Sequence, residues 1–183
     1  MRLPFKILNI SRDKQYDELF LPKFNGWLGG DAGCSIQLSQ NRILWLFGDT
    51  IIGELEKCNR KVLFPHINNS IAITTLESKN NMETKFYWNL KDGYPSSFFP
   101  RTPLGEDIYY WPTNGLLVKE NLLIFCYVVR GNFKGDYLDF WNTIDTGLIV
   151  IKNFHDDPRS WKMDYEALGL GNDDFGIHSA LPY

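Results

Sequence analysis

Cysteine is scarce in this 183-residue sequence, where Cys34, Cys58 and Cys126 lie far apart and no two of them form a CxxC pair. Three scattered cysteines build neither a disulfide framework nor a zinc site, and they are typical of a reducing compartment. His66 and His155 have no partners at metal-ligand spacing. No phosphate-binding glycine loop or dinucleotide fingerprint occurs either. We therefore expect no metal site built by the protein and no cofactor.

The chain also lacks a surplus of positive charge and a long hydrophobic run. It has 19 Lys and Arg against 22 Asp and Glu, a net charge of -3 and a pI of about 5.6, so nucleic acid is not an expected partner. The longest apolar run, 122–129, is too short to cross a bilayer. The first residues carry too many charges after a short apolar stretch for a secretory signal. We expect a cytoplasmic protein with no membrane partner, and export without a cleaved signal stays open.

Helical periodicity is the third thing that is scarce. Only 12–20 and 161–170 predict helices, and both are short. Strand patterns dominate, because several runs are rich in β-branched and aromatic residues and are separated by polar groups at hairpin distance. The predicted strands are 32–38, 42–47, 69–76, 84–90, 115–118, 121–129 and 146–151. The sequence thus predicts an all-β protein with antiparallel pairing.

Two of these strands are apolar throughout, at 43–47 and 122–129. An antiparallel strand with one wet face should alternate apolar and polar residues. Because these strands do not alternate, both of their faces should be covered by other parts of the protein. Radially stacked sheets provide such cover, and so do the middle strands of a sandwich.

An internal repeat favours the radial arrangement. A tryptophan, a glycine, a strand, a polar turn, an apolar strand and a closing glycine occur twice, roughly 80 residues apart, in the range of repeated supersecondary units. The marker residues are Trp27, Gly33 and Gly48 in the first copy and Trp111, Gly115 and Gly131 in the second. The segment 172–183 looks like the beginning of a third copy.

The segments GGDAGCSIQLSQNRILWLFGDT, YYWPTNGLLV and FGIHSALPY resemble successive blade openings of the five-bladed β-propeller glycoside hydrolases. That superfamily includes arabinanases, β-xylosidases, invertases and neoagarooligosaccharide hydrolases, and the closest resemblance is to a branch with WLFGDT in its first blade. The resemblance implies a partial five-bladed β-propeller of about two and a half blades, roughly half of a full ring. Blade 1 would span about 27–90, blade 2 about 107–165, and the start of blade 3 about 172–183.

In that superfamily, carboxylates at one end of a central channel act on a glycosidic bond, one as base and one as acid. The resemblance implies that Asp31 is the base, and it places His178 near the position of the proton donor in the third blade. An Asx turn at the start of the hairpin is the structural alternative for Asp31. Asn114 stands where related enzymes carry an aspartate, and it cannot titrate, which favours a binding module over an enzyme.

Aromatic residues are plentiful, with Trp 6, Tyr 9 and Phe 13, and they could build a thick core or line a sugar cleft. Trp27, Tyr110, Trp111 and Asn114 are the candidates for binding a carbohydrate substrate. Packing between blades is the alternative role for the aromatic members of this set.

The glycines around Asp31 have an expected structural role. Gly29, Gly30 and Gly33 would allow backbone to approach a ligand closely. Asp49 follows an apolar strand, and we expect it to cap a turn rather than to take part in catalysis.

The leading hypothesis is therefore a glycoside hydrolase-like propeller that binds and hydrolyses an oligosaccharide. The alternatives are a non-catalytic module that binds carbohydrate or protein, and a truncated remnant that needs a partner to complete its ring. An open half-ring would leave apolar faces and strand edges exposed. Its expected partner is a second copy in a homodimer or a separate chain that carries the complementary half.

Overall fold

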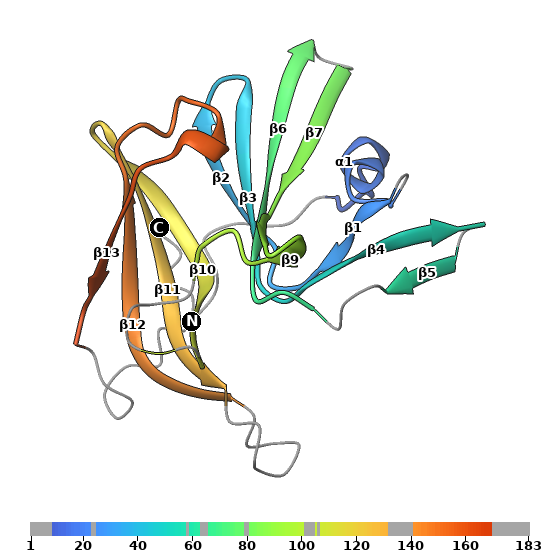
Figure 1. The fold of residues 1–183 in the computed structure, drawn as a ribbon. Coiled ribbons are helices and arrows are strands. Elements are labelled where there is room, and N and C mark those ends of the chain that lie inside the picture. The colour runs from blue at the N-terminus through green and yellow to red at the C-terminus, as the bar shows by residue number, and fades with distance from the viewer. Residues whose placement is uncertain are drawn as a thin grey trace.

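The structure is a computed structural model that describes residues 9–22, 25–57, 59–62, 66–78, 81–100, 105, 107–131 and 141–169. For 141 and 142 only the backbone is described. Two four-stranded antiparallel sheets dominate these residues, and each runs in chain order from its first strand to its last (Figure 1). The first sheet contains β2 (Cys34–Ser39), β3 (Arg42–Phe47), β6 (Ser70–Ser78) and β7 (Asn81–Tyr87). The second sheet contains β10 (Ile108–Val118), β11 (Asn121–Gly131), β12 (Trp141–Ile151) and β13 (Met163–Ala167).

A three-stranded side sheet lies beside the first sheet and is formed partly by the chain between β3 and β6. It consists of β1 (Gly26–Gly30), β4 (Thr50–Glu56) and β5 (Asn59–Val62), in the order β1-β4-β5. A short hairpin, β8 (Asn89–Lys91) and β9 (Tyr94–Ser96), follows the first sheet. None of the predicted strands covered the side sheet, because its strands are rich in glycine or charge.

The first predicted helix is confirmed, although it is shorter than the expected 12–20. Helix α1 spans Lys14–Leu19 and is capped by Asp13, whose carboxylate accepts hydrogen bonds from the N–H groups of Gln15 and Tyr16. Within the described part of the chain, no helix is both long and apolar enough to traverse a lipid bilayer.

The second predicted helix, 161–170, is wrong. A 3₁₀ turn at Pro158–Ser160 is followed by strand β13, which pairs with β12 in antiparallel register. Met163 and Tyr165 pack on the core, whereas Asp164 and Glu166 are exposed, so the segment alternates with the period of a strand. Pairing with β12 supplies the backbone hydrogen bonds that a helix would have made internally.

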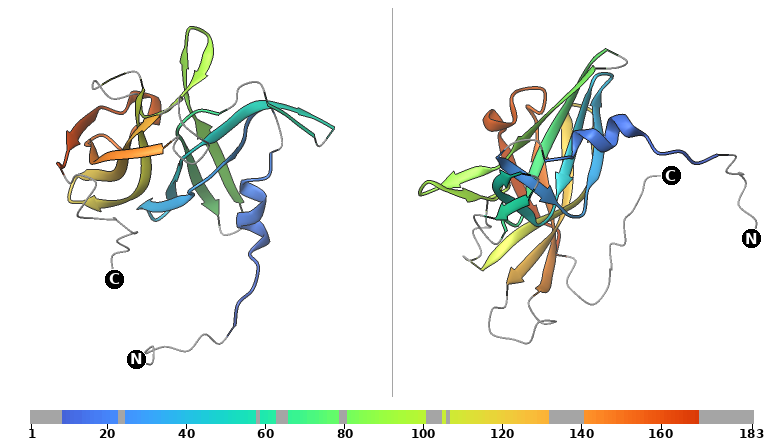
Figure 2. Two further views of the ribbon diagram at one scale, coloured as in Figure 1. Left: turned by 90° about the horizontal axis from the view of Figure 1, so that it is seen from below. Right: turned by 90° about the vertical axis from the view of Figure 1, so that its right-hand side faces the viewer.

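The main core lies between the two four-stranded sheets. Its fully buried members include Leu44, Leu46 and Ile71 from the first sheet, with Ile124 and Ile149 from the second. Burying each such side chain contributes roughly 1.5–3 kcal/mol to folding. The view from below in Figure 2 separates the second sheet from the first sheet and the side sheet. The prediction of an all-β fold is confirmed, and the two four-stranded sheets are consistent with a partial propeller.

The two apolar strands differ in how their faces are covered. Strand β3 is covered on both sides: Leu44 and Leu46 face the main core, whereas Trp45 and Phe47 pack in an aromatic cluster with Phe20. That cluster also contains Trp27 from β1 and Phe86 from β7. In β11 the burial alternates, so that the face bearing Leu123, Phe125 and Tyr127 is only half-buried by described residues. The expectation of two covered faces is therefore confirmed for β3 alone.

Polar side chains join the two four-stranded sheets. From β3, Arg42 donates three hydrogen bonds to the backbone carbonyls of Phe154, His155 and Asp156, at 3.0, 2.7 and 2.9 Å. Asn69 is fully buried, and its amide nitrogen donates to the carbonyl of Tyr110 at 2.9 Å. Because buried polar groups need partners, these bonds fix how the sheets lie relative to each other.

Candidate functional site

A cavity of about 580 Å³ opens where the side sheet meets the end of β3. Its polar lining consists of two acids and two basic residues, and its remaining wall is apolar or glycine. The acids are Asp31 and Asp49, and the basic residues are Arg60 and His66. The apolar and glycine wall is formed by Phe20, Trp27, Leu28, Gly29, Gly30 and Ile51.

Backbone hydrogen bonds hold the two acids next to each other. The N–H of Asp31 donates to the carbonyl of Asp49, and the N–H of Gly48 donates to the carbonyl of Asp31, both at 3.1 Å. Thr50 and Ile67 exchange two further backbone bonds, at 2.8 and 2.9 Å, and these bring His66 to the same place. The carboxyl groups are thus positioned by main chain rather than by flexible side-chain contacts.

Gly48 connects this acid pair to the second sheet. A Cβ at position 48 would overlap both the indole nitrogen of Trp111 and the Oδ1 atom of Asp31. The indole of the second sheet and the carboxylate beside the first sheet therefore approach each other over the bare α-carbon of Gly48. This packing accounts for the glycine in the FGDT motif.

The electrostatics of Asp49 are unusual for a surface turn. Its Oδ1 atom is buried and accepts no hydrogen bond from the described residues. The nearest basic side chain is that of His66, whose Nε2 lies 4.0 Å away, beyond hydrogen-bonding distance. Burial raises the pKa of Asp49 to about 6; the charge of His66 opposes this rise, and the charge of Asp31 adds to it. Asp49 is therefore a carboxyl group that can hold a proton in mildly acidic solution.

Two neighbours respond to the same environment. Burial raises the pKa of Asp31, although backbone N–H groups of Asp49 and Asp31 and the charge of His66 oppose the shift. Burial also raises the pKa of Tyr109, with a smaller contribution from the charge of Asp49. The second sheet thus contributes a neutral tyrosine hydroxyl and an indole beside the acids of the first.

The innermost strands of the two sheets, β2 and β10, run side by side in the same direction. Trp111 lies over Gly48 next to Asp31, the thiol of Cys34 donates to Oδ1 of Asn114 at 3.2 Å, and Gly115 packs against Ile36. A second cavity of about 640 Å³ lies between these strands and includes Cys34 and Asn114 in its lining. The structure therefore brings Asp31 and Trp111 together. Asn114 lies three residues further along β10, where it contacts Cys34 of β2.

Two of the predicted substrate-binding aromatics are core residues in this structure. Trp27 is only 8% exposed, stacks on Phe86 with ring centroids 4.2 Å apart, and donates from its indole to Ser70 Oγ. Tyr110 is 7% exposed and stacks on Tyr165 at 5.0 Å. Their substrate-binding roles stay predictions, as does that of Asn114, whose Oδ1 also accepts from the N–H of Gly115.

The predicted structural residues are placed as follows. Gly29 and Gly30 belong to β1, which carries an irregularity in its pairing with β4 between Trp27 and Gly29. Gly33 directly precedes β2, and Asp49 lies on the turn between β3 and β4. His178 lies outside the described residues, together with the expected start of a third blade at 172–183.

Sequence reasoning missed two members of the cavity, His66 and Arg60, as well as the neighbouring Tyr109, and it gave Asp49 a purely structural role. His66 was dismissed because it has no metal-ligand spacing, and Arg60 lies on an exposed strand without a motif. Among the described residues, no group of three or more His, Cys, Asp or Glu side chains is arranged to hold a metal ion. The signal for Asp49 was its place directly after an apolar strand, which brings a carboxylate to the end of a buried sheet.

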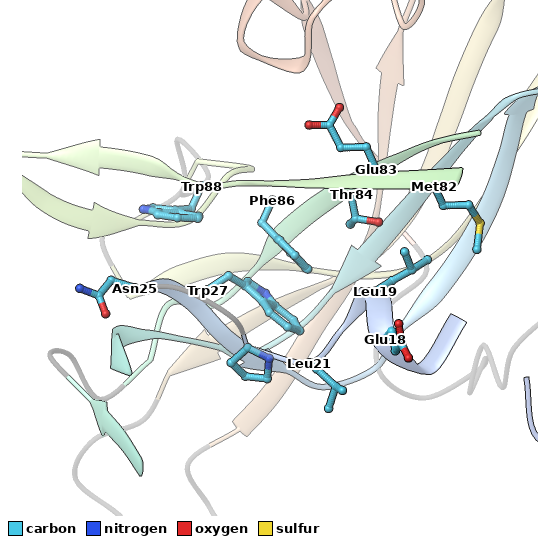
Figure 3. A pocket seen from close by; sticks show the side chains of 11 residues that line it. Glu18, Leu19, Leu21, Asn25, Trp27, Met82, Glu83, Thr84, Phe86 and Trp88 are labelled. Atoms are coloured by element: carbon cyan, nitrogen blue, oxygen red, sulfur yellow. The ribbon is translucent and has the colours of Figure 1, made fainter. Parts of the chain in front are cut away.

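A separate groove of about 390 Å³ lies between α1, the start of β1 and the outer strand β7 (Figure 3). Trp27, Phe86 and Trp88 form its aromatic part, and Leu19, Leu21, Pro22 and Met82 extend it. Its ionisable side chains are both acidic, Glu18 and Glu83, and Asn25 and Trp88 lie at the same end of the groove (Figure 3). Trp27 lines both this groove and the acid-containing cavity, so the two are adjacent.

Comparison with known proteins identifies a family. The profile described as a domain of unknown function, DUF5005, matches residues 13–163, which is most of the chain. The chain belongs to this family. No curated protein gives a significant sequence match to it.

One solved structure similar to this DUF5005 chain is a Bacteroides ovatus protein described as a "putative hydrolase". The two superpose with a TM-score of 0.63 at 19% sequence identity. The match covers 80% of this chain and 40% of that one, so the chain spans well under half the length of its structural relative. At this identity the likeness concerns the fold.

Proposed function

We propose that this DUF5005 chain is part of a glycoside hydrolase-like propeller in which Asp31 is the catalytic base and Asp49 the proton donor. The observation that carries the proposal is the pairing of Asp31 with Asp49 in one cavity, with a buried Asp49 oxygen that accepts no hydrogen bond from the described residues. Similarity to a structure described as that of a hydrolase is in keeping with it.

The chemistry needs two carboxyl groups in different protonation states. Asp49, whose pKa burial raises to about 6, donates its proton to the glycosidic oxygen as the bond to the leaving sugar breaks. Asp31 remains ionised and takes a proton from the water that attacks the anomeric carbon. The Asp49 side chain keeps 21% of its surface exposed, so its carboxyl can meet a substrate although the Oδ1 atom is buried.

The test is hydrolysis of arabino-, xylo-, fructo- and neoagaro-oligosaccharides, followed by chromatography of the released sugars. Asp31→Asn and Asp49→Asn should each lower kcat/KM by at least about a hundredfold, because general acid–base catalysis contributes roughly 10²–10⁴-fold. For the wild type, kcat/KM should fall as the pH rises through about 6, because Asp49 must be protonated to act. The chain would not be a hydrolase of these sugars if none of them were cleaved.

A matched set of variants separates the possible donors. His178→Gln should retain activity if Asp49 is the donor, and loss of activity in His178→Gln with retention in Asp49→Asn would reverse the assignment. Circular dichroism and thermal melting of each variant control for folding.

A non-catalytic carbohydrate-binding module is the second candidate. The adjacent groove in Figure 3 favours it, because Trp88 and Phe86 offer aromatic surface beside the amide of Asn25 and the carboxylate of Glu18. Under that alternative, Trp88→Ala would abolish sugar binding, whereas Asp31→Asn would weaken it only modestly and no substrate would be cleaved.

A further inference from the structure

The cavity with the acid pair contains a basic residue that the proposed reaction does not use. Arg60 lies on β5, the outer strand of the side sheet, and its guanidinium reaches over the backbone of Gly29. The Nη1 atom lies 3.5 Å from the position that a Cβ on Gly29 would occupy. The exposed guanidinium therefore lies beside the glycine pair that leads into Asp31.

Arg60 and the acids share a cavity without pairing. Among the described residues, no carboxylate lies within ion-pair distance of Arg60, although Asp31 and Asp49 line the same space. The next residue on the strand behaves differently, because Lys61 bonds to Glu54 at 3.1 Å and lies 3.4 Å from Glu56. Because side chains alternate along β5, Arg60 lines the cavity, whereas Lys61 forms ion pairs on the surface.

From this placement we propose that Arg60 binds an anionic substituent of the sugar, so that the substrate is an acidic glycan. This inference rests on the proposed function. A planar guanidinium forms two parallel hydrogen bonds with a carboxylate or a sulfate, and such charge-assisted bonds are stronger than neutral ones. His66 adds a second basic group on the same wall, 4.0 Å from Asp49.

The residue proposed to bind the anionic group and the two proposed catalytic acids come from different parts of the cavity wall. The acids at 31 and 49 lie at the end of β3, where Trp111 approaches from the second sheet, whereas Arg60 comes from the side sheet. An anionic group on Arg60 would leave the glycosidic bond free to face the acids. The two acids alone would repel an acidic sugar, and Arg60 offsets that repulsion.

The experiment is an array of immobilised neutral, uronic-acid and sulfated glycans probed with the Asp31→Asn chain, which prevents turnover, followed by calorimetry on the best-bound glycan. We expect acidic glycans to be preferred over their neutral counterparts by at least about tenfold in Kd, and the preference to shrink as NaCl is added. Uronic-acid and sulfated glycans form separate arms, which distinguish a carboxylate from a sulfate as the bound group.

The control compares two neighbouring cations. Asp31→Asn combined with Arg60→Gln should lose the preference for acidic glycans, whereas the same background with Lys61→Gln should retain it. A preference for neutral glycans, or a preference that survives Arg60→Gln, would overturn the role of Arg60 while leaving the hydrolase proposal standing. Failure to bind glycans of any class would overturn both.

Discussion

The first and second sheets each consist of four antiparallel strands in chain order, yet the faces of the two sheets are covered differently. The first sheet is covered on one face by the second sheet and on the other by the aromatic cluster of Phe20, Trp27, Trp45, Phe47 and Phe86. The second sheet has one buried face, and described residues leave Leu123, Phe125 and Tyr127 half-buried on its other face. Strands with equally apolar sequences therefore do not have equally buried side chains.

The same two sheets divide the chemistry of the site. The two acids lie at the end of the first sheet, where the chain turns into the side sheet. The second sheet supplies neutral groups beside them, including Trp111 over Gly48 and Tyr109, whose pKa rises further because Asp49 is near. The site therefore depends on the contact between the sheets as well as on its acids.

The difference in coverage between the two sheets should be largest in the stability of two phenylalanine variants, one from each sheet. Phe47→Ala should lower the free energy of unfolding by about 3–5 kcal/mol, because Phe47 is 5% exposed inside the aromatic cluster. Phe125→Ala removes the same side chain from the half-buried face of β11 and should cost about 1 kcal/mol.

Urea denaturation of both variants measures the difference. Equal losses would mean that the second face of β11 is as well covered as that of β3, as it would be in a complete ring or a complementary dimer. Light scattering on the same samples would then test the predicted association with a second copy.

Adding a single methyl group at position 48 tests the contact between the two sheets. Gly48→Ala places a Cβ against the Trp111 indole and the Asp31 carboxylate, and it should cost about 1–3 kcal/mol. The matched control is Gly29→Ala, whose Cβ would lie at an ordinary 3.5 Å from Arg60 and should leave stability nearly unchanged. Similar stability for the two variants would contradict the close approach over Gly48.

Much of this fold could be predicted from patterns of apolar residues. The runs at 42–47 and 121–129 predicted β3 and β11 because such short apolar stretches between polar turns suit buried strands. The helix predicted at 161–170 failed because its apolar residues fit both periods. Trp161, Tyr165 and Leu168 have helical spacing, Met163 and Tyr165 alternate as in a strand, and pairing with β12 decided between them. The side sheet escaped prediction because β5 is exposed along its whole length and two of its four residues are charged.

The site was only partly predictable for a different reason. Asp31 stood out because the resemblance to the propeller glycoside hydrolases places it at the position of the base. The sequence could not show that Asp49 lies beside it, since a backbone pairing across the turn brings them together. Nor could it distinguish Trp27, which is buried against Phe86, from Trp111, which lies over Gly48. Burial and proximity decide these roles, and both arise from tertiary packing.

The central claim is that Asp31 and Asp49 form one interacting pair, and the most direct test is an NMR titration of the Asp49 carboxyl carbon. The account predicts a pKa of about 6 in the wild type, a lower value in Asp31→Asn because a repelling charge is removed, and a higher one in His66→Gln because an attracting charge is removed. A carboxyl that titrates near pH 4 in all three proteins would contradict it.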